Sequence, residues 1–394
     1  MREGWEIRKL GEICTIKGRI GFRGYTREDL VNAGDGAITL SPSNIIDDKL
    51  SLAKCQYISW FKYEQSPEIK IFNGDIIFAK TASIGKVAIV DNLPEKATIN
   101  PQFVVMKEIK ENNHFLYYAL RSRPFKFQLS QIINGVAIPT VSQSNLEKLS
   151  IPVPPIAEQE KIVAELDCLI GIIEKKKQQL KELDNLAQSI FYDMFGNVVE
   201  KKGIPVSRMD DVFSLITDGT HQTPTYTEDK DNGYKFLSAK DVVGGHIDWD
   251  GIKYIPATLH QELYKRLAPR RGDLLLCKNG TTGIAAVVET DEVFDIYVSL
   301  ALLRPKEGYQ PKYLLYAINN QETKRQFNAS LKGVGVPNLH LGEIRKTLIL
   351  TPPLDLQNAF AQKIEAMEKQ KELIKKSIRE TETLFNSRMD YWFN

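Results

Sequence analysis

The chain has 394 residues, of which 42% are hydrophobic and 26% are charged, and its formal net charge is +2. This composition is that of a soluble globular protein, and the length predicts two or three domains. No apolar run approaches the ~20 residues that a membrane span requires, and the start MREGWEIRKL lacks the apolar core of a signal peptide. These features argue against a membrane or secreted protein, and we expect a cytoplasmic one.

The four cysteines, Cys14, Cys55, Cys168 and Cys277, are far apart and form no CxxC pair, and the chain has only five histidines to partner them. Neither a disulfide framework nor a zinc site is indicated, so we expect reduced and mostly buried thiols. A small excess of Lys and Arg lies in residues 1–150. This excess is compatible with a polyanionic partner but is too mild to establish one.

Along the chain, the first legible element is GDIIFAKTASIGKVAIV, which starts at Gly74 and predicts a strand, a turn and a second strand. It returns as GDLLLCKNGTTGIAAVV from Gly272. Six residues keep their identity at one offset of 198 positions: Gly74 and Gly272, Asp75 and Asp273, Lys80 and Lys278, Gly85 and Gly283, Ala88 and Ala286, and Val90 and Val288. We expect Asp75 and Asp273 to cap the turn that starts the strand, which is a structural role.

The repeat extends well beyond this element. LYYAL faces LLYAI and GVAIP faces GVGVP at the same offset, and upstream LSPSNII matches LSAKDVV at an offset of 197. Because there are only two copies, the pattern indicates a tandem duplication and not a solenoid. We predict mixed domains at residues 1–153 and 198–351, each followed by a helical segment, at residues 154–197 and 352–394.

Each helical segment carries a heptad pattern. The proline run IPVPP cannot continue a helix, and the following AEQEKI supplies acidic residues suited to a helix N-terminus. Apolar residues then recur in alternating steps of four and three, which predicts a coiled-coil seam. The apolar seam positions are Ile162, Leu166, Leu169, Ile173, Leu180, Leu183, Ala187, Ile190 and Met194 in the first copy, and Phe360, Ile364, Met367, Ile374, Ile378, Phe385 and Trp392 in the second. Polar residues interrupt the seams at Lys176, Lys371, Thr381 and Arg388.

Connectivity sets the direction of the helices. The first ends at about Phe195, just before the second domain, and the second begins at about Leu354, just after it, so compact domains require an antiparallel pair. About 38 residues at ~1.5 Å each give a rod of roughly 57 Å. The expected fold class is α+β, with two similar mixed α/β domains separated by two long helices that form an antiparallel coiled coil of pseudo-twofold symmetry. The alternative is that each helix packs on its own domain.

Templates for catalysis fail. SIGK at Ser83 ends like a phosphate-binding loop, but Lys80 and Val87 occupy the positions where GxxxxGK[ST] needs Gly and Ser or Thr. NPQF from Asn100 resembles the NPPF motif of amino-methyltransferases, but Gln102 replaces its second proline and we expect a turn before a strand. The histidines have no spacing that suggests a metal site or a triad. We expect no catalytic residue, no metal and no cofactor in this chain.

Further matched motifs and the order of the segments indicate a protein family. The two strand-turn-strand copies are accompanied by GVAIPTVSQSNLEKLSIPVPPIAEQEKIV with its partner GVGVPNLHLGEIRKTLILTPPLDLQNAFAQKI, and by TDGTHQTPTY near the start of the second copy. With these motifs, and with the order domain, helix, domain, helix, nearly the whole chain resembles the specificity subunit of type I restriction-modification systems. The second copy departs from the PxxEQ-like run of the family, because it keeps Gln357 but has Leu356 in place of the glutamate.

The resemblance implies that each mixed domain is a target-recognition domain that reads one half of a bipartite, asymmetric site in double-stranded DNA. It also implies that the coiled coil sets the spacer and docks two modification (methyltransferase) subunits, through which restriction (motor and nuclease) subunits join. Adenine-N6 methylation and cleavage, with adenosylmethionine, ATP and Mg, would then belong to partner subunits. The main alternative is a non-catalytic coiled-coil scaffold that presents two protein-binding domains.

Divergent polar segments between the matched motifs are where DNA contacts are expected. The candidate readers are Lys17, Arg19, Arg23, Tyr25 and Arg27 in KGRIGFRGYTRED of the first copy, and Asp218, Thr220, His221 and Gln222 in TDGTHQTPTY of the second. Arginine can contact guanine or phosphate with two parallel hydrogen bonds, and short polar groups can read base edges. A solvated basic loop or a turn with satisfied hydrogen bonds is the alternative at each position.

The strand-turn-strand element adds further candidates. Lys80 and Lys278 lie in both copies beside turns rich in Ser, Thr and Gly, which suits a phosphate anchor common to both half-sites. A plain exposed lysine is the alternative. The turn residues that differ between the copies are candidate sequence readers, namely Thr81, Ser83 and Lys86 in the first and Asn279, Thr281 and Thr282 in the second.

Overall fold

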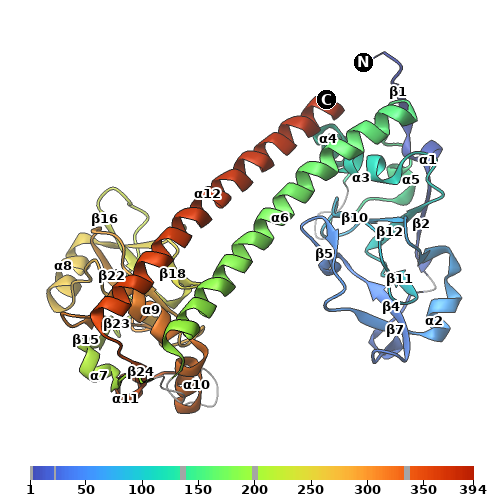
Figure 1. The fold of residues 1–394 in the computed structure, drawn as a ribbon. Helices are drawn as coiled ribbons and strands as arrows, with labels where there is room; N and C mark the ends of the chain where they lie inside the picture. Colours follow the sequence, from blue (N-terminus) through green and yellow to red (C-terminus); the bar gives the residue numbers. More distant parts are fainter. Residues whose placement is uncertain (1–2, 22–23, 134–138, 198–202, 332–337) are drawn as a thin grey trace. The chain divides into compact units, whose positions relative to one another are not determined.

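The computed structural model describes residues 3–21, 24–133, 139–197, 203–331 and 338–394. The chain forms two compact units: unit 1 comprises Met1–Lys177 and Lys376–Asn394, and unit 2 comprises Gln178–Lys375. Each unit contains one mixed domain and part of both long helices (Figure 1). The unit boundary therefore divides each helix near its middle, whereas the sequence patterns separate each helix from the domains.

The domain of unit 1 is built on two sheets. The sheet that contains the repeated hairpin is called the inner sheet. It has the order β10 (Val87–Ile89), β9 (Ile76–Ala79), β12 (Phe103–Lys107) and β2 (Thr15–Gly18). All of its neighbouring strands are antiparallel. The outer sheet has the order β3 (Leu30–Val31), β7 (Gln56–Ser59), β4 (Gly36–Leu40), β11 (Ala97–Ile99) and β8 (Lys70–Ile71). Its β4 and β11 are parallel and its other pairs antiparallel.

Short elements complete this domain. Two strand pairs lie outside the main sheets, β1 (Glu6–Lys9) with β13 (Ser150–Val153) and β5 (Ile45–Ile46) with β6 (Lys49–Leu50). The helices are α1 (Leu10–Ile13), α2 (Trp60–Gln65), α3 (Asn113–Arg121), α4 (Arg123–Gln131) and α5 (Gln143–Leu146), and the 3-10 helices are η2 (Arg27–Asp29), η3 (Pro42–Asn44) and η4 (Pro67–Ile69).

The domain of unit 2 repeats this plan. Its inner sheet has the order β15 (Phe213–Asp218), β23 (Leu300–Pro305), β20 (Leu274–Cys277) and β21 (Ala285–Val287), and its outer sheet has the order β19 (Lys253–Pro256), β16 (Gly233–Leu237) and β22 (Phe294–Ile296). The smaller pairs are β14 (Val206–Arg208) with β24 (Leu348–Leu350) and β17 (Val242–Val243) with β18 (His246–Ile247). The helices are α7 (Met209–Val212), α8 (Ala257–Arg266), α9 (Pro311–Asn319), α10 (Gln321–Ser330), α11 (Leu341–Lys346) and the 3-10 helix η5 (Ala239–Asp241).

The two domains share one topology. In both, the hairpin of the repeated motif (β9 with β10, β20 with β21) lies beside the strand that follows it in the inner sheet, and the first strand of that sheet, β2 or β15, forms the opposite edge. In both, the outer sheet contains one parallel pair, β4 with β11 and β16 with β22. The α+β fold class with two similar mixed domains and two long helices, which the sequence predicts, is confirmed.

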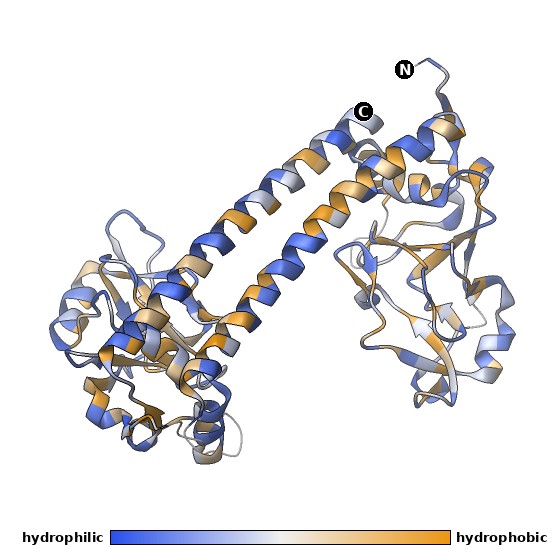
Figure 2. Cartoon of the chain, in the orientation of Figure 1, coloured by the Kyte–Doolittle hydropathy of each residue, from blue (hydrophilic) through white to orange (hydrophobic). Residues whose placement is uncertain are grey.

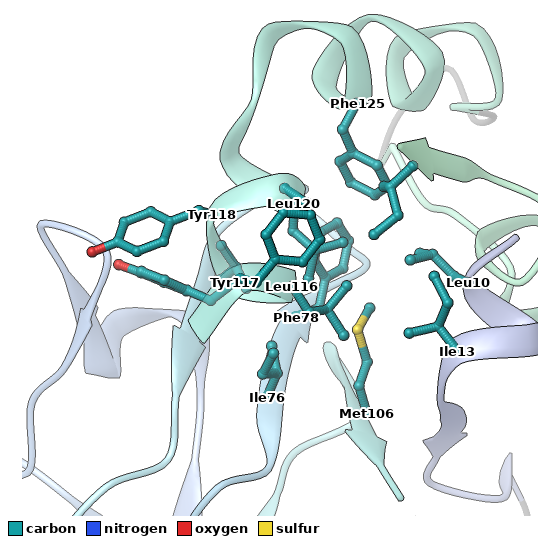
Figure 3. Close-up of a cluster of buried hydrophobic side chains, with 14 of the residues drawn as sticks. Leu10, Ile13, Ile76, Phe78, Met106, Leu116, Tyr117, Tyr118, Leu120 and Phe125 are labelled. Atoms are coloured by element: carbon teal, nitrogen blue, oxygen red, sulfur yellow. The ribbon is translucent and has the colours of Figure 1, made fainter. Parts of the chain in front are cut away.

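The inner sheets are apolar on both faces. In β9, Ile76 and Phe78 point into one cluster, where they meet Met106, Leu116 and Leu120 (Figure 3). The alternate residues of this strand join a second cluster between the two sheets. Side chains of a strand alternate between faces, so a strand buried on both faces has no polar position. This explains why the β9 residues IIFA form a continuous apolar run and not an alternating one.

Unit 2 distributes its inner strand in the same way. Leu274 and Leu276 belong to one cluster, and Leu275 and Cys277 belong to the other. Burial raises the pKa of the Cys277 thiol to about 11, which keeps it protonated and inert. Of the other cysteines, Cys14 is buried, Cys55 is half-buried and Cys168 is exposed. The expectation of mostly buried thiols thus holds for two of the four.

Two helices of 40 residues follow the domains, α6 (Ile156–Phe195) and α12 (Leu354–Phe393). The predicted end at about Phe195 and start at about Leu354 agree with these bounds. Polar and apolar residues alternate along both helices (Figure 2), and every predicted seam residue is buried or half-buried. In the part of the chain that the structure describes, no helix is long and apolar enough to cross a membrane.

The polar interruptions of the seam all find partners on the opposite helix. In unit 1, the Lys176 ammonium donates to the hydroxyls of Ser377, at 2.6 Å, and Thr381, at 3.2 Å. Arg388 of α12 pairs with Glu165 of α6. In unit 2, Lys371 of α12 pairs with Asp184 of α6. In unit 2, Phe191, which follows Asp184 in α6, also meets Phe360, which precedes Lys371 in α12. In each unit, later residues of α6 thus meet earlier residues of α12, so the pairing is antiparallel.

A buried glutamine fixes each helix N-terminus to its domain. The side-chain amide of Gln159 donates to the carbonyl of Pro154, and its carbonyl accepts from the backbone N–H of Asn112 at 3.0 Å, where α3 begins. Gln357 makes the same two bonds, to Pro352 and Gln310. The preceding Glu158 instead accepts from the indole of Trp5. The glutamine therefore recurs in both copies for a structural reason, whereas the glutamate serves a contact that is private to unit 1.

Acid is expected to weaken the helix pairing in unit 1. Hydrogen bonds from Arg388, and from the Trp392 indole at 2.9 Å, hold the pKa of Glu165 below its usual value. A carboxylate with a lowered pKa in the folded state stabilises the fold above its unfolded pKa of ~4.3, and this stabilisation is lost as the pH falls through the folded pKa. Urea denaturation should therefore show a difference in stability between the wild type and Glu165→Gln at pH 7, and this difference should shrink as the pH falls below the unfolded pKa of ~4.3. An unchanged difference would contradict the assignment.

Candidate nucleic-acid interface

The repeated hairpin has the same hydrogen-bonded frame in both units. Asp75 accepts from the backbone N–H of Phe72, and Asp273 accepts from that of Arg270, both at 2.9 Å. This confirms the predicted capping role. Each carboxylate also pairs with a cation of the neighbouring strand, Asp75 with Lys107 at 2.6 Å and Asp273 with Arg304 at 2.8 Å. Both aspartates therefore have structural roles.

The turn of each hairpin is tied to a later segment of its own unit. The backbone carbonyls of Lys80 and Lys278 accept from the N–H groups of Val141 and Leu339, in each case at 2.9 Å. The shared glycine closes the turn with a positive φ of 84° at Gly283, where an added Cβ would lie only 3.1 Å from the Phe327 ring. Only glycine adopts such a backbone without strain, which explains why it recurs.

The variable turn residues lie at the surface of this frame. Lys86 and Thr281 are exposed, and Thr81, Ser83, Asn279 and Thr282 are half-buried. The Thr81 hydroxyl lies 3.0 Å from that of Thr140, and Thr282 donates to a carbonyl of its own turn. The hairpin thus brings together the three predicted reader positions of each copy, on a backbone that is fixed from both sides. The neighbouring segments GVAIP and GVGVP lie largely outside the described residues.

The predicted reader loop of unit 1 divides into buried and exposed positions. Lys17 and Arg27 are exposed, Tyr25 is half-buried, and Arg23 lies outside the described residues. Arg19 is only 7% exposed, and its guanidinium donates to the Ile99 carbonyl at 3.2 Å and lies 5.1 Å from the Tyr25 ring. Arg19 therefore contacts the interior of the fold. A solvated basic loop, the alternative that the sequence left open, does not describe this residue.

In unit 2 the predicted readers lie at the end of β15. His221 and Gln222 are exposed, whereas Asp218 and Thr220 are buried. The Asp218 carboxylate pairs with Lys278 and lies 3.3 Å from Nε2 of His221. Lys278, the lysine that both copies share, is thus paired inside unit 2. Its counterpart Lys80 is half-buried, and burial lowers the pKa of its ammonium.

A pocket of about 320 Å³ lies beside these residues in unit 2 and was missed by the sequence patterns. Phe236 contributes to its lining, together with the rings of Tyr226 and Tyr297 and the side chains of Lys240 and Lys253. It lies at the carboxyl ends of the parallel strands β16 and β22, which is a common position for ligand sites. The Lys253 ammonium lies 4.0 Å from the centre of the Tyr226 ring.

The equivalent position in unit 1 has another chemistry. Asn100 follows β11 as Tyr297 follows β22, and the two backbone N–H groups donate to equivalent carbonyls at 2.8 Å. The Asn100 side chain accepts from the N–H of Gln102 at 3.0 Å and forms the turn that was predicted before β12. The two units thus place different side chains on one backbone. The parallel pairing that defines this position is not visible in a single sequence, although TPTY marks one wall of the pocket.

Groups that suggest catalysis are scarce in the described parts of the chain. Within them, no cluster of three or more His, Cys, Asp or Glu side chains has the geometry to hold a metal ion. A buried pair joins Nδ1 of His260 to the Asp295 carboxylate at 2.7 Å, and the imidazole stacks on the Tyr234 ring with centroids 3.7 Å apart. Stacking and the contact with Asp295 of β22 hold the His260 imidazole of α8 against the outer sheet.

Two copies of one mixed domain with divergent polar ends, joined by paired helices, define a class of protein that presents two related recognition surfaces. Residues 2–185 and 201–383 match the family model for the type I restriction modification DNA specificity domain. The chain belongs to this family.

Individual relatives support the assignment over almost the full length. The putative type I restriction enzyme MjaX specificity subunit of Methanocaldococcus jannaschii is 25% identical, with 95% of this chain and 91% of that protein covered. A chain from a type I R-M system, solved to explain complex assembly and conformational transition, has a TM-score of 0.61 at 21% identity, with coverage of 99% and 97%. The type I S subunit of M. genitalium has a TM-score of 0.52 at 13% identity, with coverage of 99% and 96%. At these identities the solved structures show a shared fold.

Proposed function

We propose that this chain is the subunit that gives a type I restriction-modification complex its DNA sequence specificity, and that each unit reads one half of a bipartite site. The observation that carries the proposal is the pair of domains with one backbone and different side chains at equivalent positions. Asn100 and Tyr297 follow equivalent parallel strands, and Gly18 and Asp218 end equivalent strands of the inner sheets. Two domains with the same backbone and different side chains can bind two half-sites of different sequence in a similar way.

The proposal places the chemistry in partner subunits. The chain itself would be non-catalytic and bind no cofactor, while adenosylmethionine, ATP and Mg would be used by two modification subunits and by restriction subunits that join the complex in the cytoplasm. The family assignment supports this division, because the matched domain is a specificity domain. The paired helices α6 and α12 would dock the modification subunits and set the spacer between the half-sites.

The decisive test is methylome sequencing of cells that express this chain with its modification subunits. We expect one bipartite, non-palindromic motif. Tyr297→Ala should change or relax the half of the motif that unit 2 reads, and Asn100→Ala should affect only the other half, since the two residues occupy equivalent positions in different units. Each variant is the control for the other.

Two outcomes would reject the function. Binding of duplex DNA that does not fall steeply with salt would favour a protein-presenting scaffold, because contacts to phosphate release counterions. Methyl transfer by the purified chain alone would contradict the division of labour. If both variants changed both halves of the motif equally, the assignment of one half-site to each unit would be wrong.

A further inference from the structure

The shared lysine of the hairpin has different surroundings in the two units. Lys80 and Lys278 occupy one backbone frame, since their N–H groups donate to Gln102 and Ser299 at 2.8 Å and their carbonyls accept from equivalent residues. The side chains therefore start from the same place. What differs is the residue at the end of the opposite edge strand of the inner sheet, β2 in unit 1 and β15 in unit 2.

In unit 2 that residue is a carboxylate. Asp218 lies opposite Ala301 of β23, and it pairs with Lys278, the two side chains being 12% and 7% exposed. Nε2 of His221 lies 3.3 Å from the same carboxylate, whose pKa is lowered by Lys278 and His221 against the effect of burial. Lys278 thus already has a counter-ion inside the protein, and a second anion would have to displace it.

In unit 1 the equivalent residue is glycine. Gly18 lies opposite Val104 of β12, and Val104 pairs with Phe78 of the hairpin strand just as Ala301 pairs with Leu276 in unit 2. A Cβ placed on Gly18 would lie 3.6 Å from the Lys80 ammonium and 3.9 Å from the Gln143 amide oxygen. Among the residues that the structure describes, the Lys80 ammonium has no hydrogen bond and no carboxylate within ion-pair distance.

We propose that the residue at positions 18 and 218 decides how the shared lysine is used: Lys80 binds a DNA phosphate in the half-site of unit 1, whereas Lys278 is an internal counter-ion and does not contact DNA. This inference rests on the proposed function and replaces the expectation of one phosphate anchor common to both units. A single ammonium acts as a point charge, which suits phosphate better than the paired hydrogen bonds of a base edge. A partly buried cation without an anion would gain such a partner when DNA binds.

The proposal predicts the salt dependence of binding for the complete complex on a duplex carrying its methylated motif. Each phosphate contact contributes about 0.9 to the slope of log K against log salt. Lys80→Ala should therefore lower the slope by about one. Gly18→Asp should do the same, because it supplies Lys80 with an internal partner. Gly18 has no positive φ and an added Cβ meets only ordinary contacts, so this variant is expected to fold.

Matched controls separate charge from shape. Gly18→Asn adds a side chain of the same size without charge and should leave the slope unchanged. In unit 2, Lys278→Met combined with Asp218→Asn removes the ion pair while keeping the interior neutral, and it too should leave the slope unchanged. Thermal melting of each variant checks that it is folded.

The outcomes are distinct. If Lys80→Ala leaves the slope unchanged, Lys80 is not a phosphate contact. If the unit 2 double variant lowers the slope as much as Lys80→Ala, both lysines contact DNA and the asymmetry is wrong. If Lys80→Ala instead relaxes the motif at one base with an unchanged slope, the lysine reads a base edge and the phosphate assignment falls. If the wild-type complex shows no sequence-specific, salt-dependent binding, the proposed function itself fails, whatever the variants do.

Discussion

Phe360→Ala is expected to destabilise unit 2 by about 3–5 kcal/mol, which is the usual cost of truncating a fully buried aromatic side chain. The Phe360 ring has no exposed surface, and its centroid lies 5.5 Å from those of Phe191 and Phe195 in α6 and 5.2 Å from that of Tyr316 in α9. The ring therefore joins α12 both to its partner helix and to the domain. Chemical denaturation followed by circular dichroism measures the loss.

Leu373 provides the control for this substitution, because it lies on the same helix and is 69% exposed. Leu373→Ala should change the free energy of unfolding by no more than about 0.5 kcal/mol. A loss below about 1 kcal/mol for Phe360→Ala would show that the aromatic cluster can collapse around the cavity, and that α12 is held mainly by its polar contacts and the remaining seam.

Phe360 also shows where a heptad pattern stops being informative. The steps of four and three place it correctly in an apolar stripe, and they also predict the helix bounds, since both depend on local sequence. The pattern does not reveal that Phe191, Phe195, Met389 and Phe393, which lie off the predicted seam, are buried as well. Near their ends the helices pack on a domain in addition to each other, so a second face is apolar there, and the partner is a surface distant in sequence.

The candidate site was predicted less completely for the same reason. The repeat identifies Lys278 as a shared position, but its partner Asp218 is 60 residues away and meets it only because β15 and β20 both flank β23. The burial of Arg19 depends on the Ile99 carbonyl, 80 residues away. Residue type and spacing therefore indicated where polar groups gather. Which of these polar side chains form contacts inside the protein depends on sheet registers that a single sequence does not show.

The polar positions of the seam restrict how the helices can slide. Lys176 reaches two hydroxyls of α12 in unit 1, and Lys371 pairs with Asp184 in unit 2. A shift of one helical turn, about 5.4 Å, would separate each lysine from its partners and leave it against apolar neighbours. Polar residues in coiled-coil seams are known to specify register at some cost in stability. The pairing of α6 and α12 is thus fixed in register within each unit, as a ruler requires.

If the paired helices set the distance between the half-sites, inserting four residues after Lys177 and four after Lys375 should lengthen the spacer of the methylated motif by one or two base pairs. The insertions fall at the unit boundary, so neither domain core is changed, and insertion in both helices keeps them paired. Four residues add ~6 Å and rotate the helix by roughly 40° beyond a full turn. One base pair adds ~3.4 Å and about 34°.

Both half-site sequences should remain as in the wild type, because the reading residues lie in the domains. The control is an eight-residue insertion after Gly34, in an exposed turn of unit 1 where an added side chain meets no neighbour. It lengthens the chain by the same total but should leave the spacer unchanged. Methylome sequencing reports the spacer directly. A helix-insertion variant that stays folded and active, yet methylates only the original motif, would show that the junctions between helices and domains absorb the added length, and that the coiled coil does not set the spacing.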